Sequence, residues 1–325
     1  MRRVAGAGGG WPMAFGTTVT AVLASVAMVG ASAAAAYAGQ PASVPTGNDV
    51  SYPQCTETLP SGQAFGIVAV NAGLANNTNP CLTAEISWAQ ASTGAARRPK
   101  VSLYVNTAEP GNHGIADWPT DNDDPLTGNQ VFDPYGTCTG RNNQACAWQY
   151  GWDMAELDAQ ARGVPNPGRY RWWLDVEMLN TWESSSRNNR ADLEGMVSYF
   201  HRIGATAGLY STAKQWDPIV GPVPPASPLY RLPDWIPGAK TLAQAKKNRR
   251  LARLTGGGIV SLTQWRSKPA NRDFSCRSLP SPGRRLVRLG HDAASSRFTA
   301  AAPAMAWPGS GDCGMRLNSV QPAAA

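Results

Sequence analysis

The sequence predicts an α/β fold in which mostly parallel strands close into a barrel. Short apolar runs alternate along the chain with stretches of helical pattern, which is typical of an α/β architecture. The apolar runs show little polar alternation, as expected for strands of a parallel sheet covered on its outer face. No glycine-rich nucleotide loop follows the first strand, so a barrel fits the pattern better than an open nucleotide-binding sheet.

The expected elements follow one another in a regular order. Strands are expected at residues 48–52, 66–73, 100–107, 171–178, 205–212, 234–239 and 258–265. Helices are expected at residues 82–94, 148–162, 188–203 and 241–254. The third helix follows the polar stretch SSSRNN, which suits capping, and ends at Gly204. The fourth helix is rich in Lys and Arg.

The first residues have the pattern of an export signal. Arg2 and Arg3 precede an alanine-rich apolar stretch, and Ala36-Tyr37-Ala38 is a small-x-small site of the kind that signal peptidase cleaves. A retained membrane anchor is the alternative, but the stretch is weakly hydrophobic. We therefore expect residues 1–38 to be a signal peptide. The protein is then secreted, with the cell wall as a place of association and no stable membrane insertion after cleavage.

Composition and charge separate the remaining chain into a predicted barrel and a predicted tail. Residues 39–276 carry the strand and helix pattern, whereas residues 277–325 are rich in Pro, Ala, Ser and Arg and are expected to be disordered. The formal net charge is +7, but the tail holds six arginines and only two aspartates. The barrel is therefore close to neutral and has no basic face interleaved with aromatic residues, so nucleic-acid binding is not expected.

Cysteine usage agrees with export. The six cysteines are Cys55, Cys81, Cys138, Cys146, Cys276 and Cys313, and none forms a C-x-x-C pair. Disulfides are the default for cysteines in an exported chain, although six cysteines allow fifteen pairings. Cys138 and Cys146 are close enough to staple the long polar connection over residues 108–147, and Cys55 with Cys81 is the next choice. A connection of this length is usually functional or disordered, and a disulfide within it favours an ordered loop.

Two carboxylates interrupt the apolar strand RYRWWLDVEM. Because side chains alternate along a strand, Trp173, Asp175 and Glu177 share one face, which points into the barrel. The acids lie toward the carboxyl end of the strand, where barrel enzymes build their active sites. Burial and mutual repulsion should raise the pKa of one carboxyl group. A protonated carboxyl beside an ionised one is the arrangement that glycoside hydrolysis uses.

Other uses of these acids remain open. Three histidines far apart in sequence offer no ligand spacing for a transition metal, so we expect neither a metal nor a cofactor, although an oxygen-liganded calcium site is not excluded by the pattern. Both acids could instead form ion pairs with Arg169 or Arg171. Such locked ion pairs would favour a binding protein, whereas a free acid cluster would favour an enzyme.

Polar and aromatic residues gather at the ends of the other strands. They are Asp49, Asn71, Asn106, Tyr210, Gln264 and Trp265. Each of them alone has an ordinary structural explanation, such as a turn former or a core edge. Together they predict a ring of hydrogen-bonding groups and flat apolar faces, which suits a sugar ring.

The motifs GNDVSYPQ, WWLDVE, GLYST with QW, DWIPG and LTQW occur in the order seen in glycoside hydrolase family 25 lysozymes. The chain resembles the secreted actinobacterial branch of this family over about residues 47–276. The resemblance implies a modified TIM-like (β/α) barrel whose last strands lack full helices. It also implies cleavage of the bond between N-acetylmuramic acid and N-acetylglucosamine in peptidoglycan.

Matched motif by motif, the resemblance assigns roles to individual residues. Glu177 resembles the general acid, and Asp175 would assist it by orienting the acetamido group of the sugar or by stabilising developing charge. Asp49 resembles an acid on the first strand that lines the cleft, and Asp273 in NRDFSC is the candidate for a further acid late in the barrel. The DWIPG motif adds Asp234 and Trp235 to the expected substrate-binding residues.

The sequence therefore favours an exported, monomeric peptidoglycan hydrolase that uses carboxylate acid/base catalysis. The alternative is a weakly active or inactive protein of the cell envelope that binds peptidoglycan or another envelope glycan on the same barrel. The stretch AKKNRRLARLTGGG holds no cysteine where the family pattern places a partner for Cys276. The partner of Cys276 stays open, with Cys313 as one choice.

Overall fold

The computed structural model describes residues 45–276 with the exception of Arg97. The predicted signal peptide (1–38) and the predicted tail (277–325) lie outside these residues, and so does Cys313 as a partner for Cys276. Within residues 45–276 without Arg97, the chain forms eight β-strands and five α-helices.

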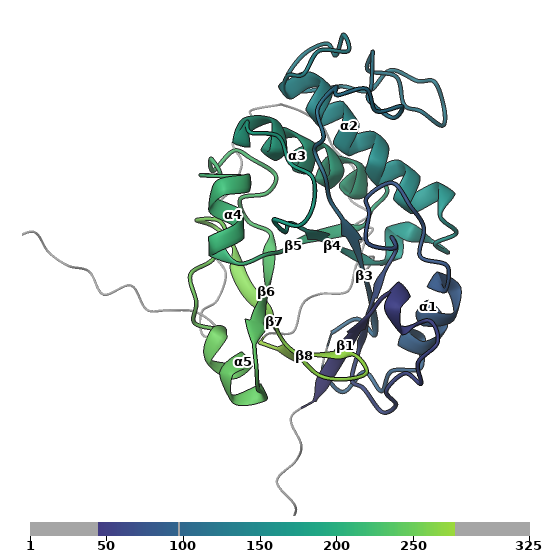
Figure 1. Cartoon of the computed structure of the whole chain (residues 1–325), viewed down its shortest axis with the longest axis vertical. Coiled ribbons are helices and arrows are strands. Elements are labelled where there is room, and N and C mark those ends of the chain that lie inside the picture. The colour runs from purple at the N-terminus through teal and green to yellow at the C-terminus, as the bar shows by residue number, and fades with distance from the viewer. Residues whose placement is uncertain (1–44, 97, 277–325) are drawn as a thin grey trace, which may run out of the picture. The chain divides into compact units, whose positions relative to one another are not determined.

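Eight strands form a closed barrel in the order of the sequence (Figure 1). They are β1 (Thr46–Val50), β2 (Gly66–Ala69), β3 (Val101–Asn106), β4 (Arg171–Asp175), β5 (Thr206–Tyr210), β6 (Pro233–Ala239), β7 (Ile259–Trp265) and β8 (Asn271–Ser275). Strands β1 to β7 are parallel to one another, and β8 is antiparallel to both β7 and β1. The predicted α/β barrel is confirmed, but β8 is an additional strand that the pattern did not predict.

The antiparallel strand β8 closes the barrel without a crossover helix. Phe274, near its carboxyl end, pairs with Thr46 at the start of β1. Strand β8 therefore ends at the face of the barrel where β1 begins, which is opposite to the carboxyl ends of the parallel strands.

Five α-helices connect the strands. They are α1 (Leu82–Gln90), α2 (Gln144–Glu156), α3 (Ser186–Arg202), α4 (Ala213–Ile219) and α5 (Leu242–Asn248). Helix α4 was not expected, and α5 is shorter than the predicted helix over 241–254. Only the short α5 separates β6 from β7, and no helix lies between β7 and β8. The last strands thus lack full helices, as the family resemblance implied.

The two faces of β4 pack as the alternation predicts. Trp172, Leu174 and Val176 belong to the large cluster of buried residues between the sheet and the helices. Trp173 points inward and packs with Trp235 and Leu262 inside the barrel. The interior of an eight-stranded barrel is narrow enough for side chains to fill, so only the mouth remains open for a ligand.

Helices α2 and α3 pack backbone against backbone. A Cβ atom at Gly151 of α2 would collide with the carbonyl group of Asp192, and one at Gly195 of α3 would collide with the carbonyl group of Trp148. The absence of a side chain at both positions is therefore what permits this close packing. Asp192 lies at this contact and is buried.

The connection over residues 108–147 is ordered and leads directly into α2. The structure contains the disulfides Cys138–Cys146 and Cys55–Cys81, the two pairs that the sequence spacing suggested. Inside the connection, the side-chain amide of Asn122 donates to Asp133 and to Gln149 of α2, both at 3.3 Å. These contacts fix the connection on the outer surface of α2. Among the helices of residues 45–276, none is long and apolar enough to span a lipid bilayer.

Candidate active site

A small cavity of about 130 Å³ opens at the carboxyl ends of the parallel strands. Its lining consists of polar and aromatic side chains from seven strands or the loops that follow them: Asp49, Tyr104, Asp175, Glu177, Tyr210, Trp235, Gln264 and Asn271. Six of these eight residues were predicted from the sequence. The cavity lies where barrel enzymes place their catalytic groups.

Asp175 ends strand β4 and is only 7% exposed. Burial holds the pKa of this carboxyl group well above its ordinary value, and the negative charges of Glu177 and Asp49 raise it further. Its Oδ1 atom has no hydrogen-bond partner within the described part of the chain. The backbone is held firmly, because the Asp175 carbonyl accepts hydrogen bonds from Thr107 Oγ1 at 2.7 Å and from Asn180 Nδ2 at 2.9 Å.

Glu177 lies two residues beyond β4 and is half-buried at the cavity. Gln215 of α4 holds this segment from one side: its Nε2 lies 3.5 Å from Glu177 Oε1, and its Oε1 accepts a hydrogen bond from the Met178 amide at 2.9 Å. Trp182 holds it from the other side by donating to the Glu177 carbonyl at 2.9 Å. The Glu177 carboxyl group thus has a fixed backbone and a single, long side-chain contact.

Asp49 faces the two other acids from β1. Gln264 Nε2 donates to its Oδ2 at 3.0 Å, and Asn271 Nδ2 donates to its Oδ1 at 3.3 Å. Burial raises the pKa of Asp49, and these hydrogen bonds oppose the increase. Tyr210 donates to Gln264 Oε1 at 3.2 Å, which fixes the orientation of the Gln264 amide.

Asp273 lies behind Asp49 and does not line the cavity. It is completely buried and accepts a hydrogen bond from Trp235 Nε1 at 2.8 Å. Burial holds its pKa well above the ordinary value, and the neighbouring charge of Asp49 raises it further. The expected contact between Asp273 and a substrate is therefore corrected: this carboxyl group positions Trp235 and influences Asp49 from the interior.

The acids are not locked in ion pairs. Among residues 45–276 without Arg97, none of Asp49, Asp175, Glu177 and Asp273 forms a salt bridge. Arg171 lies at the start of β4, donates to the Ala207 carbonyl at 3.2 Å and stacks over Trp173. Arg169 is exposed. Neither arginine neutralises the acids, so the ion-pair alternative is not found.

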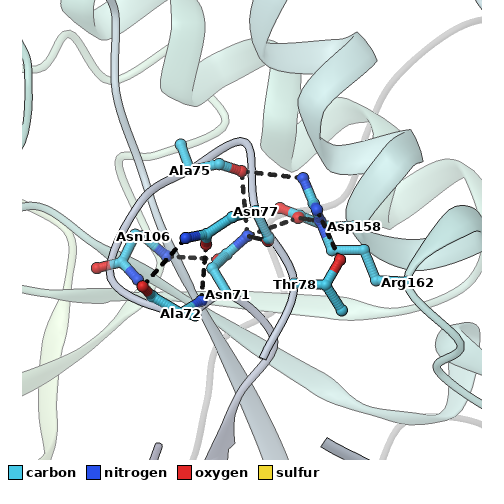
Figure 2. Close-up of polar contacts among 8 residues, drawn as sticks. All are labelled: Asn71, Ala72, Ala75, Asn77, Thr78, Asn106, Asp158 and Arg162. Carbon is cyan, nitrogen blue, oxygen red and sulfur yellow. Dashed lines mark hydrogen bonds and ion pairs between the residues drawn. The ribbon is translucent and has the colours of Figure 1, made fainter. Parts of the chain in front are cut away.

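Two predicted residues build the neighbouring loop instead of the cavity wall. Asn71 is fully buried, and its side-chain amide donates to Asp158, Ala75 and Asn77, as Figure 2 shows. Its side-chain oxygen accepts from the Asn106 backbone amide at 2.8 Å. Asn71 therefore connects the loop after β2 to the end of β3 and to the helical turn Leu157–Ala161 that follows α2. Asn106 is half-buried beside the cavity and uses its backbone in this network.

Three further predictions of substrate contact are corrected by strand geometry. Trp235 and Gln264 point into the barrel, so their neighbours Asp234 and Trp265 point outward. Asp234 is buried and accepts a hydrogen bond from the Leu254 amide at 3.1 Å, and Trp265 packs against α5. Trp173 faces inward but is buried beneath the cavity floor.

Three residues of the site were not predicted from the sequence. Tyr104 lies two positions before Asn106 on β3 and therefore shares its face, which is a signal that alternation could have provided. Asn271 belongs to β8, a strand that was not expected. Gln215 reaches Glu177 from α4, and no local pattern indicates such a contact.

Among the described residues, the side chains that lie close enough together to share a metal ion are outside the cavity. Within the described part of the chain, the side chains close enough to hold one ion are Cys55, Cys81 and Glu85, and the two cysteines form a disulfide. The cavity itself supplies carboxyl, amide and aromatic groups. These groups can bind the hydroxyl groups of a sugar ring and transfer a proton.

Comparison with known proteins adds a relationship over one segment. Residues 168–232 match the family model described as Lys-1, Lysozyme-like protein 1. Lysozyme-like protein 5 of Caenorhabditis elegans is 45% identical over 49 residues, which are 15% of this chain and 22% of that protein. Probable GH family 25 lysozyme 4 of Dictyostelium discoideum is 41% identical over 49 residues, with the same coverage of 15% and 22%. The chain thus spans about a fifth of the length of these relatives. The segment matched by the family model carries Asp175 and Glu177.

Two solved structures match this chain at low sequence identity and low TM-score. A bacterial lysozyme from Streptomyces coelicolor is 14% identical, with a TM-score of 0.42, and the match covers 73% of this chain and 94% of that one. A muramidase from Trichobolus zukalii is 13% identical, with a TM-score of 0.42, over 72% and 94% of the two chains.

Proposed function

We propose that this protein is an exported glycoside hydrolase that cleaves peptidoglycan at the bond between N-acetylmuramic acid and N-acetylglucosamine. The observation that carries the proposal is the group of three carboxyl groups, Asp49, Asp175 and Glu177, around a small cavity at the barrel mouth without a cationic partner among the described residues. Buried acids with raised pKa values in a cleft are typical of acid/base catalysis.

Asp175, at the end of β4, and Glu177, two residues beyond it, differ in position and therefore in role. Burial raises the pKa of Asp175 well above its ordinary value, whereas Glu177 is half-buried and closer to solvent. Glu177 is then the group that reaches the glycosidic oxygen and donates the proton to it. Asp175 stabilises the positive charge that develops on the sugar or orients its acetamido group.

The remaining residues of the cavity bind and orient the sugar. The indole of Trp235 stands between Tyr210 and Tyr104, with ring centroids 4.5 and 6.1 Å away. Asp49, Gln264 and Asn271 provide a hydrogen-bonded set of oxygens and amides for hydroxyl groups. Similarity to lysozyme-like proteins over residues 168–232 supports the proposal. Export through a signal peptide, monomeric state and membership of the secreted actinobacterial branch are parts of the same proposal.

The test is release of reducing sugar from purified peptidoglycan by the protein and by Glu177→Gln. This substitution keeps the shape of the side chain and removes its titratable proton, so the rate should fall by about 10²-fold or more. Glu57→Gln, at an exposed position away from the cavity, is the matched control and should leave the rate unchanged. An inactive parent that is folded and still sediments with the wall would instead identify a glycan-binding protein.

A further inference from the structure

A second hollow begins beside the candidate active site. It has a volume of about 330 Å³ and lies between the loop after β2, the start of the 108–147 connection and the loop after β4. Its lining includes Leu74, Ala75, Ile115, Asp117, Tyr150 and Leu179. A further hollow of about 300 Å³ shares Asn76 and Asp117 with the first and extends to Arg162. We call the two together the insertion groove.

The insertion groove adjoins the backbone segment that carries Asp175. Thr107 and Asn180 line it, and both donate hydrogen bonds to the carbonyl group of Asp175. On the opposite face of this peptide segment lies the cavity that contains the Asp175 carboxyl group. The two hollows thus lie on two sides of the segment that carries Asp175, and a branch of a ligand held over the acids has the groove as a neighbour.

The walls of the insertion groove suit small apolar groups. Leu74 and Leu179 are exposed, Leu179 to 95%, and Ala108 and Ile115 are partly exposed beside them. Isolated exposed apolar residues need no explanation, but several around one concave surface indicate a place where a ligand is bound.

The unpaired charge of the groove is negative. Asp117 is exposed and has no salt bridge within the described residues. Burial raises the pKa of the Tyr150 hydroxyl, and the negative charges of Asp192, Asp117, Asp158 and Glu109 raise it further. These four acids therefore surround the floor of the groove.

The cation in the lining is already engaged. Arg162 contacts Asp158, Thr78 Oγ1 and the Ala75 carbonyl (Figure 2). A ligand with an apolar body and a free positive charge complements this surface, with Asp117 as the exposed partner for the charge.

We propose that the insertion groove binds the peptide that branches from the peptidoglycan strand, with the free side-chain amine of its diamino acid beside Asp117. This inference rests on the proposed function. The peptide is attached to the lactyl ether of N-acetylmuramic acid, so it leaves the strand next to the bond that is cleaved. Its alanine methyl groups match the small apolar walls, and its amine matches the unpaired charge. The 108–147 connection thereby selects strands that carry amine-bearing peptides.

The test is a calorimetric titration of the full chain with the peptide N-acetyl-L-Ala-γ-D-Gln-L-Lys-D-Ala and with the same peptide acetylated on the lysine side chain. We expect the free-amine peptide to bind and acetylation to weaken binding roughly fivefold, as the loss of an exposed ion pair does. Asp117→Asn should weaken binding of the free-amine peptide to the same extent. It should leave binding of the acetylated peptide unchanged. Asp217→Asn, at an exposed position of α4, is the charge-matched control and should bind like the parent.

The outcomes separate this inference from the proposed function. Glu177→Gln should bind the peptide as the parent does, because Glu177 does not line the groove. Hydrolysis of glycan strands stripped of their peptides tests the hydrolase alone. If the parent hydrolyses stripped strands but binds no peptide, or binds both peptides equally well, the inference is overturned while the proposed function stands. Peptide binding without hydrolysis supports the groove and refutes the hydrolase.

Discussion

Replacing Glu109 with Gln tests how the 108–147 connection is held against the barrel. Glu109 is completely buried, and neither carboxylate oxygen has a hydrogen-bond partner in the described part of the chain. Its backbone amide donates to the Thr181 carbonyl at 3.0 Å, which fixes the backbone position of this residue. Burial, and then the charge of Glu183, raise the pKa of Glu109 from 4.5 to about 8.

The raised pKa defines the sign and the size of the effect. The folded protein prefers the protonated carboxyl group, so stability is full below the unfolded pKa and falls as the pH rises toward about 8. The shift from 4.5 to about 8 corresponds to at most roughly 5 kcal/mol at 1.36 kcal/mol per pH unit. Structural relaxation reduces this gain in stability. The buried amide of Gln reduces it further, because its hydrogen-bonding groups also need partners. We expect Glu109→Gln to stabilise the protein by about 2 kcal/mol at pH 9.

Thermal unfolding at two pH values measures this effect. At pH 9 the melting temperature of Glu109→Gln should exceed that of the parent by about 4–8 °C, because 1 kcal/mol corresponds to about 2–4 °C in a domain of this size. At pH 4 the two proteins should melt together, since Gln resembles the protonated acid. Glu57→Gln should show no difference at either pH. A loss of stability that is equal at pH 4 and pH 9 would refute the reasoning, because it would show a packing effect without a buried charge.

Three other changes test the contacts around the site. Gln215→Ala removes the side chain that holds the Glu177 segment, so kcat on peptidoglycan should fall by about tenfold. A lower kcat with an unchanged pH–rate profile would show that Gln215 only positions the acid. Gly151→Ala places a methyl group against the backbone of α3 and should destabilise the protein by about 3 kcal/mol or prevent folding, as urea unfolding would show. Replacing both Cys138 and Cys146 with Ser removes a loop constraint worth about 2–3 kcal/mol, and limited proteolysis should then cleave first inside the connection.

The barrel and the central acids could be predicted because they depend on local periodicity. The strand RWWLD has a face for the helices and a face for the interior, and the structure places its residues accordingly. The same rule, applied to every strand, would have prevented two errors. Asp234 with Trp235, and Gln264 with Trp265, are neighbours in sequence, so only one member of each pair can face the cavity.

Other features depend on contacts between distant segments. Strand β8 is short and rich in polar residues, and it is defined by its pairing with β7 and β1. Asn71 has the position of a ligand-binding residue at a strand end. Its side-chain amide instead donates a hydrogen bond to Asp158, which lies 87 residues away in the sequence. The burial of Glu109 depends on the packing of the connection in three dimensions, so no sequence pattern indicates its raised pKa.

The antiparallel strand that closes the barrel has a practical consequence. Strand β1 starts and strand β8 finishes on the face opposite to the cavity, since Thr46 pairs with Phe274. Both ends of the described barrel are therefore available as attachment points that leave the mouth unobstructed. A barrel anchored to a bead through a linker at either end would present its carboxyl groups to the surrounding medium, which makes the fold suited to immobilised assays on insoluble walls.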